Sequence, residues 1–336
     1  MPKSIIGGWR GLSLATQPDI ATPAVVNTLL QFAGEPLEPE PETYYVNDTE
    51  VTGELLPTDH RLLTKKLTGK HTSKAFPHLV GLFASMAMGK DTATAVDSTS
   101  AYKHKIEIYK CVLELPYRTL IEHDGFQQML YAGVACVGFK LRGERGGFVE
   151  FEADLVGSAS EAVDATAKPP RVVESYLAYG DVTLTKGGVF DGDKVTGGTS
   201  LNAELKSFEF EYKNNGKGVY LMGDPSGQVG QVRRGNKYEV NFAAELELES
   251  PAHRADLLAG NEFVLNLPIV GGVADGDARY TVEIILPRVA YKEAKRGVDD
   301  GILKLAAKFA VLADPVYGGL ILNVINLQQT SYLAAA

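Results

Sequence analysis

Histidines are the residues whose type first suggests catalysis or metal binding, and their spacing in this chain supports neither. No His-Glu-x-x-His pattern and no other paired-ligand spacing connects them. Two of them stand at the starts of predicted helices, where we interpret them as capping or packing residues. The six are His60, His71, His78, His104, His123 and His253, and the two at helix starts are His78 and His253.

Motifs for nucleophilic or nucleotide chemistry are also missing from the sequence. There is no G-x-S-x-G elbow, and residues 223–230 are glycine-rich without the Gly-Lys-Ser/Thr end of a phosphate loop. Two Asp-Gly-Asp stretches, at 191–193 and 275–277, do not continue into the six or more oxygens of a calcium loop, so we interpret them as turns. The sequence predicts no catalytic, cofactor-binding or metal site.

Carboxylates two residues apart are the last chemical candidates. Such spacing places both on one face of a strand, which is equally the pattern of any solvated strand face, so we do not assign an acid/base pair. The pairs are Glu150 with Glu152 and Glu245 with Glu247. We therefore turn from chemistry to the elements that carry these residues.

Composition places the 336-residue chain among soluble globular proteins, with 45% apolar and 22% charged residues. Its formal net charge of -9 argues against tight binding to a nucleic-acid backbone. We expect no secretory signal and no membrane helix. The cysteines, Cys111 and Cys136, are expected to be two buried thiols.

The stretch 237–260 gives the clearest structural pattern. Apolar residues alternate with polar ones from Tyr238 to Glu249, which predicts a long half-buried strand. Ser250 and Pro251 suit the start of a helix, and Gly260 suits its end. A second strand followed by a helix is expected at 60–72 and 73–89.

This repetition suggests two similar domains. Hairpins with similar turns and alternation are expected over 133–157 and near the C-terminus, where KRGVDDGILKLAAKFAVLADP resembles LRGERGGFVEFEADLVGSA. Residues 116–130 are interpreted as an insertion in the first copy. Residues 157–172 are small and polar and contain prolines, and this stretch is the predicted linker. The predicted division is an N-terminal arm (1–40, with a possible helical stretch at 24–32), a first domain (41–160), a linker (161–175) and a second domain (176–336).

Taken together, these elements resemble the tail tube proteins of long-tailed bacteriophages. The stretches that carry the resemblance are TGELLPTDHRLLTKKLTGKHTSKAFPHLVGLFASMAMG and YAGVACVGFKLRGERGGFVEFEADLVGS. The resemblance implies a mainly β fold with short helices, in tandem β-sandwich or split-barrel units, each flanked by a helix. Most such subunits carry one unit and form hexameric rings. Two units in one chain imply a trimeric ring with pseudo-sixfold symmetry, as in tubes of some thermophile-infecting phages.

The same resemblance implies the biology. The protein would be made in the host cytoplasm and built into the virion tail, where stacked rings form a hollow conduit for DNA ejection. Its partners would be copies of itself, tape-measure and tail-tip proteins, and genomic DNA that passes without specific binding. No cofactor, catalysis or membrane is implied.

Two sets of residues become candidates within this interpretation. A negative or neutral lumen wall lets DNA slide, since it does not bind phosphates. We expect the wall to include Glu150, Glu152, Asp154, Glu239, Glu245 and Glu247. The long glycine-rich loop over 214–236 is expected to reach an adjacent ring through the cations at its end, Arg233, Arg234 and Lys237.

A different class of function remains open at this point. A two-domain β-sandwich that binds a surface or a carbohydrate would expose aromatic residues on one sheet face and would not polymerise. Tyr44, Tyr45, Tyr176 and Tyr179 are the tyrosines that would serve such a face. A hydrolase with two strand carboxylates lacks any supporting motif.

Overall fold

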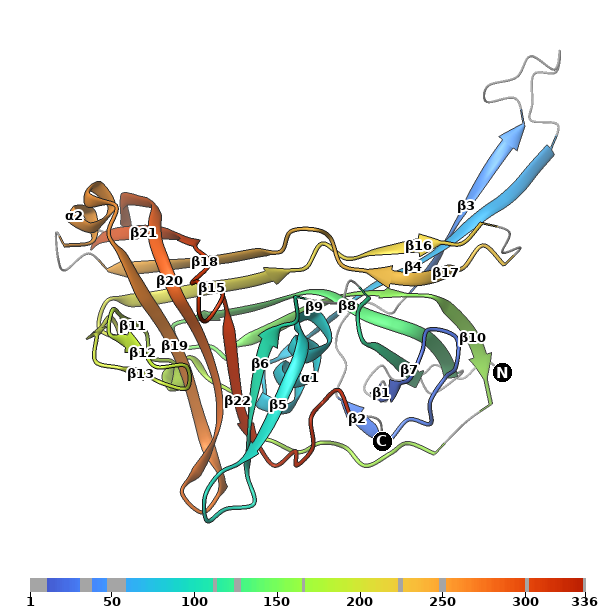
Figure 1. Cartoon of the computed structure of the whole chain (residues 1–336), viewed down its shortest axis with the longest axis horizontal. Coiled ribbons are helices and arrows are strands. Elements are labelled where there is room, and N and C mark those ends of the chain that lie inside the picture. The colour runs from blue at the N-terminus through green and yellow to red at the C-terminus, as the bar shows by residue number, and fades with distance from the viewer. Residues whose placement is uncertain are drawn as a thin grey trace.

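The computed structural model confirms a mainly β fold with two short helices (Figure 1). It describes residues 11–30, 38–46, 59–110, 114–123, 128–164, 167–222, 226–247, 252–299 and 302–334. Most of the predicted N-terminal arm outside 11–30, Cys111, and the helix-start residues Ser250 and Pro251 lie outside these ranges.

A four-stranded antiparallel unit forms in the first half of the chain. Its strands follow one another across the sheet in the order β3, β4, β9, β8. Their bounds are β3 (Glu38–Val46), β4 (Asp59–Lys74), β9 (Glu150–Gly157) and β8 (Gln128–Glu144). β3 and β4 form a long hairpin, and so do β8 and β9.

The second half contains a unit with the same order. Here β15, β18, β21 and β20 follow one another, again antiparallel; β20 and β21 form a hairpin, and the chain between β15 and β18 contains two further paired strands, β16 and β17. Their bounds are β15 (Leu205–Lys213), β18 (Glu239–Glu247), β21 (Ile302–Val311) and β20 (Ala278–Asp299). The predicted long strand in this region is thereby confirmed over Glu239–Glu247.

Two details identify equivalent positions in the two units. First, a helix follows the second strand of each: α1 (Pro77–Met88) follows β4, and α2 (Ala252–Ala259) follows β18. Second, the register of the last strand breaks at one point, after Cys136 in β8 and after Tyr291 in β20. Since a β-bulge fixes register, Gly138 of β8 corresponds to Glu293 of β20.

The two units are joined edge to edge within the chain. β8, the last strand of the first unit, pairs with β15, the first strand of the second, from Gly138↔Lys213 to Glu144↔Ser207. Eight strands therefore form one continuous sheet, in the order β3-β4-β9-β8-β15-β18-β21-β20, and Figure 1 shows β3 and β20 at its two ends.

The N-terminal part of β8 carries a second group of strands. β7 (Tyr117–His123) and β10 (Ala159–Val163) pair with its opposite edges, and β1 (Gly11–Gln17) joins β7 to β2 (Thr28–Leu30). The possible helix over 24–32 is wrong for residues 28–30, which form a strand. Residues 117–123, within the stretch interpreted as an insertion, form a fully buried strand.

The remaining strands close the other side of the molecule. β20 pairs with β19 (Glu262–Asp275) and with β22 (Ile321–Asn326). β22 in turn pairs with β6 (Tyr102–Ile108), and β6 pairs with β5 (Gly89–Ala95). Short strands and one 3-10 turn complete the fold: η2 (Tyr179–Asp181), β11 (Thr185–Lys186), β12 (Val189–Phe190), β13 (Val195–Thr196), β14 (Thr199–Ser200), β16 (Lys217–Tyr220) and β17 (Val229–Arg233).

Helix α1 is the centre of the core. Pro77 suits its first turn, and Gly89 ends it in the left-handed conformation at φ 85°. It lies between β8 on one side and β22, β6 and β5 on the other, so every one of its residues is buried. The predicted helix is thus confirmed, and its apolar character on all sides is explained by this position.

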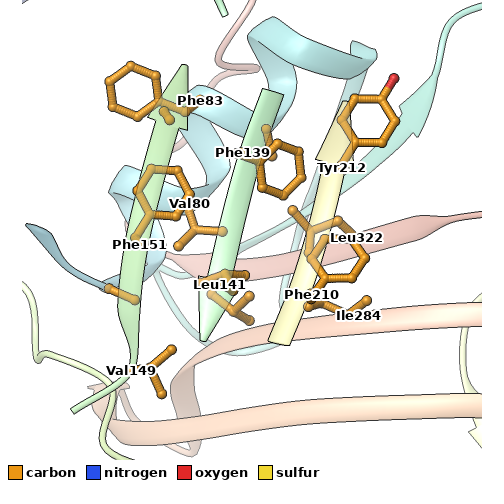
Figure 2. Close-up of a cluster of buried hydrophobic side chains, with 14 of the residues drawn as sticks. Val80, Phe83, Phe139, Leu141, Val149, Phe151, Phe210, Tyr212, Ile284 and Leu322 are labelled. Atoms are coloured by element: carbon orange, nitrogen blue, oxygen red, sulfur yellow. The ribbon is translucent and has the colours of Figure 1, made fainter. Parts of the chain in front are cut away.

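Aromatic side chains pack against one another beneath the β8–β15 pairing and connect the cores of the two units. Phe83 of α1 stacks on Phe151 of β9 with ring centroids 5.8 Å apart, and Phe139 of β8 follows at 6.3 Å. Phe139 lies 5.5 Å from Tyr212 of β15 (Figure 2). Rings at these separations stabilise beyond their buried area, so the β8–β15 joint is reinforced from beneath.

The C-terminal segment is fixed under α1. Tyr332 is buried against Gly81, where an added Cβ would come within 2.5 Å of its ring. Its N–H donates to Asp91 at 2.6 Å, and its hydroxyl accepts from Asn326 at 2.7 Å. Nearby, the buried carboxyl of Glu174 accepts the N–H of His78 at 2.7 Å.

Glu174 gives this region a pH dependence. Burial raises its pKa to about 7, so the folded protein holds the proton that the unfolded chain releases near pH 4.5. A raised carboxyl pKa costs stability as pH rises through this window. We expect Glu174→Gln to unfold like the parent protein near pH 4 and to be more stable by on the order of 2 kcal/mol at pH 8.

Urea unfolding at the two pH values measures this difference. His71 and His78, whose pKa values burial lowers to about 4, destabilise parent and variant alike at low pH and cancel. A difference in unfolding free energy that does not change with pH contradicts the assignment.

Candidate functional site: the charged face of the sheet

The eight-stranded sheet has one apolar and one charged face. In β9, Phe151, Ala153 and Leu155 are buried, and they alternate with the predicted candidates Glu150, Glu152 and Asp154. The apolar face covers α1 and the core. The other face carries the charges, and it extends over both units.

Strand register shows that all six predicted carboxylates share this face. Residues directly opposite each other in neighbouring strands point to the same side. Glu152 is opposite Lys140, Lys140 is opposite Glu211, and Glu211 is opposite Asn241. By the same alternation the face contains Glu150, Glu152 and Asp154 in β9 and Glu239, Glu245 and Glu247 in β18.

In the first unit, cations from neighbouring strands pair with these carboxylates. Arg142 of β8 contacts Glu150 at 2.6 Å and Glu152 at 3.6 Å. Lys70 of β4 lies 3.6 Å from Glu152 and 3.9 Å from Asp154. Each cation thus lies between two carboxylates.

The joint between the units is bridged in the same way. Lys140 of β8 forms an ion pair with Glu209 of β15 at 2.8 Å. Beside it, Glu211 contacts Lys213 at 2.7 Å. Burial alone would raise the pKa of Glu211, but hydrogen bonds from Lys213 and Asn241 and the charge of Lys140 lower it overall. The β8–β15 joint therefore combines backbone pairing with ion pairs.

The second unit continues the pattern. Glu245 contacts Lys304 of β21 at 2.8 Å, and Glu247 contacts Arg145 of the first unit at 2.7 Å. Glu239 accepts from the side chain of Asn215 at 3.1 Å. Five of the six candidates are therefore in ion pairs, and Glu239 is hydrogen-bonded to a neutral amide.

A shallow groove of about 630 Å³ crosses this face near the β8–β9 turn. Arg142, Glu150, Glu209, Glu245 and Lys308 line it, and Ala243 and Ala306 form part of its floor. Each of these charged residues has an ion-pair partner, and Arg142 and Glu150 pair with each other within the groove. In the part of the chain that the structure describes, no three His, Cys, Asp or Glu side chains gather as metal ligands.

The predicted loop at 214–236 is a hairpin, β16–β17, that crosses onto the first unit. Val229 and Val232 are buried against Leu115 and Tyr117, and the N–H of Leu115 donates to the carbonyl of Val232 at 3.2 Å. The hairpin thus contributes to the core of its own chain.

The three loop cations differ in what they contact. Arg234 donates to the carbonyl oxygens of Tyr109 and of Lys110, the latter at 2.6 Å. Arg233 donates to Gln231 within the hairpin at 2.8 Å, and Lys237 is exposed. Arg234 is therefore committed to its own chain.

The exposed part of this hairpin is an apolar tip that the sequence reasoning missed. Leu221 is 54% exposed, Met222 is fully exposed, and Tyr220 is partly so. The run Val-Tyr-Leu-Met within an otherwise polar, glycine-rich stretch is the signal that would have found it.

The tyrosines considered for a surface-binding face do not form one among the described side chains. Tyr176 packs its ring on Phe76 and Phe148, and the Tyr179 hydroxyl donates to the carbonyl of Leu205 at 2.6 Å. Tyr44 and Tyr45 lie in β3, whose side chains are outside the description.

A broad sheet face covered with charges, backed by one buried helix, defines a mainly β protein with one charged and one apolar sheet face. The chain matches the family model of the phage tail tube proteins over residues 11–307. It therefore belongs to the phage tail tube protein family, and the resemblance seen in the sequence is confirmed. Its place is the tail of the virion, where the family implies an oligomeric assembly. No curated protein matches the chain.

Among the described residues, neither helix is long and apolar enough to span a membrane.

The ion pairs of the charged face lead to a stability prediction. Glu245→Lys replaces the Glu245–Lys304 pair by two cations at the same place, and we expect a loss of about 1 kcal/mol in unfolding free energy at low salt. Raising the salt concentration should recover part of the loss, because salt screens like-charge repulsion.

Urea unfolding at two salt concentrations measures the effect. Glu161→Lys, at an exposed position on β10, is the control for the same charge change and should alter stability little. Equal losses in both variants, or no salt dependence for Glu245→Lys, contradict the pairing.

Proposed function

We propose that this chain is the subunit of the tail tube itself: it forms rings that stack into a hollow conduit for DNA ejection, and the charged face of the sheet lines the lumen. The observation that carries the proposal is the pair of four-stranded units joined edge to edge with one common charged face. Three chains would supply six such units and a pseudo-sixfold ring.

The packing of the sheet supports an inward charged face. The apolar face is covered by α1 and the core, so the charged face is the broad sheet surface left for solvent. A wall on which carboxylates and cations neutralise each other offers few free cations to hold phosphates. DNA would then slide past it without specific binding, and no step of this function requires catalysis.

Ring formation requires a head-to-tail contact between copies. Such a contact uses two different surfaces of the subunit, and it closes into a ring when the rotation per subunit permits. The internal β8–β15 joint is already a head-to-tail contact between two units of the same kind. Repeating it between chains gives the ring.

Stacking of rings requires a second contact. We assign it to the apolar tip of the β16–β17 hairpin, Tyr220, Leu221 and Met222, with the nearby cations Arg233 and Lys237 at its base. Exposed apolar side chains at a projecting tip are suited to bury themselves in another subunit. Tape-measure and tail-tip proteins would meet the first or last ring through the same surfaces.

The lumen assignment predicts an effect on DNA passage. Glu152→Lys together with Glu245→Lys turns two paired sites into clusters of cations, which would bind phosphates. We expect tubes of normal length and DNA ejection slowed at least about threefold, the delay shrinking as salt rises. Ejection is followed by dye fluorescence after phage are triggered in vitro.

The matched control adds the same charge away from this face. Asp97→Lys with Glu161→Lys changes two exposed residues, one in a turn and one on β10. Equal ejection rates for the two double variants, in tubes of normal appearance, contradict the lumen assignment.

The stacking assignment predicts a defect in polymerisation. Leu221→Asp with Met222→Asp leaves the folded subunit intact, because both side chains are exposed, but places charge where a neighbouring ring should bury the tip. We expect a folded protein with a normal unfolding midpoint and loss of long tubes by electron microscopy. Normal tubes from this variant rule the tip out; substituting exposed Val273 by Asp is the control.

A further inference from the structure

Strand β20 ends with an unpaired edge. One edge of its last part pairs with β21 up to Asp299, while the other pairs with β19 only as far as Ala290. Among the described residues, no strand pairs with this second edge between Glu293 and Asp299. An open edge of this length offers its N–H and C=O groups to another strand.

The equivalent edge in the first unit is occupied. β8 pairs with β7 along the early part of the corresponding edge, and β15 pairs with the part that follows the bulge. Since Gly138 corresponds to Glu293, the segment of β8 that pairs with β15 corresponds to the open segment of β20. The β8 segment is therefore paired with β15, whereas among the described residues the equivalent β20 segment has no strand partner on that edge.

The opposite end of the sheet supplies the missing strand. β3 holds the place in the first unit that β15 holds in the second, and in the described residues it pairs with β4 alone. Figure 1 shows β3 and β20 at opposite ends of the sheet, so they cannot pair within one chain.

We propose that β20 of one subunit pairs antiparallel with β3 of the next, in a register that places Lys295 opposite Glu38. This deepens the proposed ring by naming its interface. The register follows from the internal joint. Lys140 is opposite Glu211 there, Lys140 corresponds to Lys295 by the bulge, and Glu211 corresponds to Glu38 through the strand pairings of each unit.

One charge pair supports this register. In the internal joint the cations Lys140 and Arg142 of β8 are opposite the carboxylates Glu211 and Glu209 of β15. In the proposed register Lys295 is likewise opposite Glu38, and opposite charges across a sheet pair stabilise it. The next position on the same face places Glu40 opposite Glu293, where the like charges oppose the pairing.

The joint between subunits would be weaker than the internal one for two further reasons. Asn214 donates its N–H to the carbonyl of Val137 at 3.1 Å, but the corresponding residue of β3 is Pro41, which has no N–H. Beneath the sheet, Ala294 stands where β8 has Phe139. Prolines on an edge strand restrain uncontrolled pairing, so charge and stacking would decide when rings close.

Disulfide trapping tests the pairing directly. In a full-length Cys111→Ser background, Lys295→Cys and Glu38→Cys are combined in one chain; directly opposite residues in antiparallel strands lie within disulfide range. Cys136 is fully buried and burial raises the pKa of its thiol, so it is unreactive. Under mild oxidation we expect most chains to run as covalent dimers and closed trimers on denaturing gels.

Two controls fix the interpretation. Mixing the two single-cysteine proteins should give dimers and nothing larger, because each chain then has one reactive edge. Lys295→Cys with Glu42→Cys shifts the partner by four residues and should give at most a tenth of the cross-linked product. Cross-linking of this shifted pair instead overturns the register.

If no Lys295–Glu38 cross-link forms, the pairing is overturned, whether or not the protein makes tubes. If tubes form without the cross-link, the tube proposal still stands. Cross-linked trimers that never stack would support the pairing and contradict the tube. Charge reversal gives an independent check: Lys295→Glu and Glu38→Lys should each reduce trimer formation, and their combination should restore it. Failure of the combination to restore it, in folded protein, counts against the proposed pairing.

Discussion

The pairing of β8 with β15 is the interaction on which the rest of the molecule depends. It joins two four-stranded units into one sheet, brings their charged residues onto one face, and aligns Phe139, Tyr212 and Phe83 beneath it. Without this pairing each unit would end in an open edge, and an open edge is an aggregation risk. By joining two units in one chain, the protein satisfies half of its edges during folding and leaves one complementary pair, β20 and β3, for assembly.

The two units have diverged where their surroundings differ. Helix α1 is buried on every residue because β22, β6 and β5 cover it, whereas α2 buries only His253 among its residues and keeps Leu258 exposed. His253 is held between Tyr291 and Glu204, at 2.8 Å and 2.7 Å. The first unit thus contains the main core and the second presents more surface. The buried hydrophobic residues of both nevertheless form one continuous cluster, so the halves should fold together.

Local patterns in the sequence predicted the elements that bury one face. The strand at 239–247 shows strict alternation, and the helix at 77–88 has Leu79, Leu82, Phe83 and Met86 at helical spacing, so both were found. Strands β1 and β7 were missed because they are short, buried on both faces and flanked by prolines, which removes the alternation. They pair with each other across about a hundred residues of sequence, a distance over which local patterns carry no information. The six carboxylates were correctly grouped by their alternation, but the cations that neutralise them come from neighbouring strands, and strand order was not available from the sequence.

Electron cryomicroscopy of tubes assembled from the purified full-length chain tests the central claim most directly. The account predicts three chains per ring, an inner barrel made of repeated eight-stranded sheets, and density for Glu152, Lys140 and Glu245 on the lumen side. Rings of six chains, or a charged sheet face turned to the outside, would contradict it.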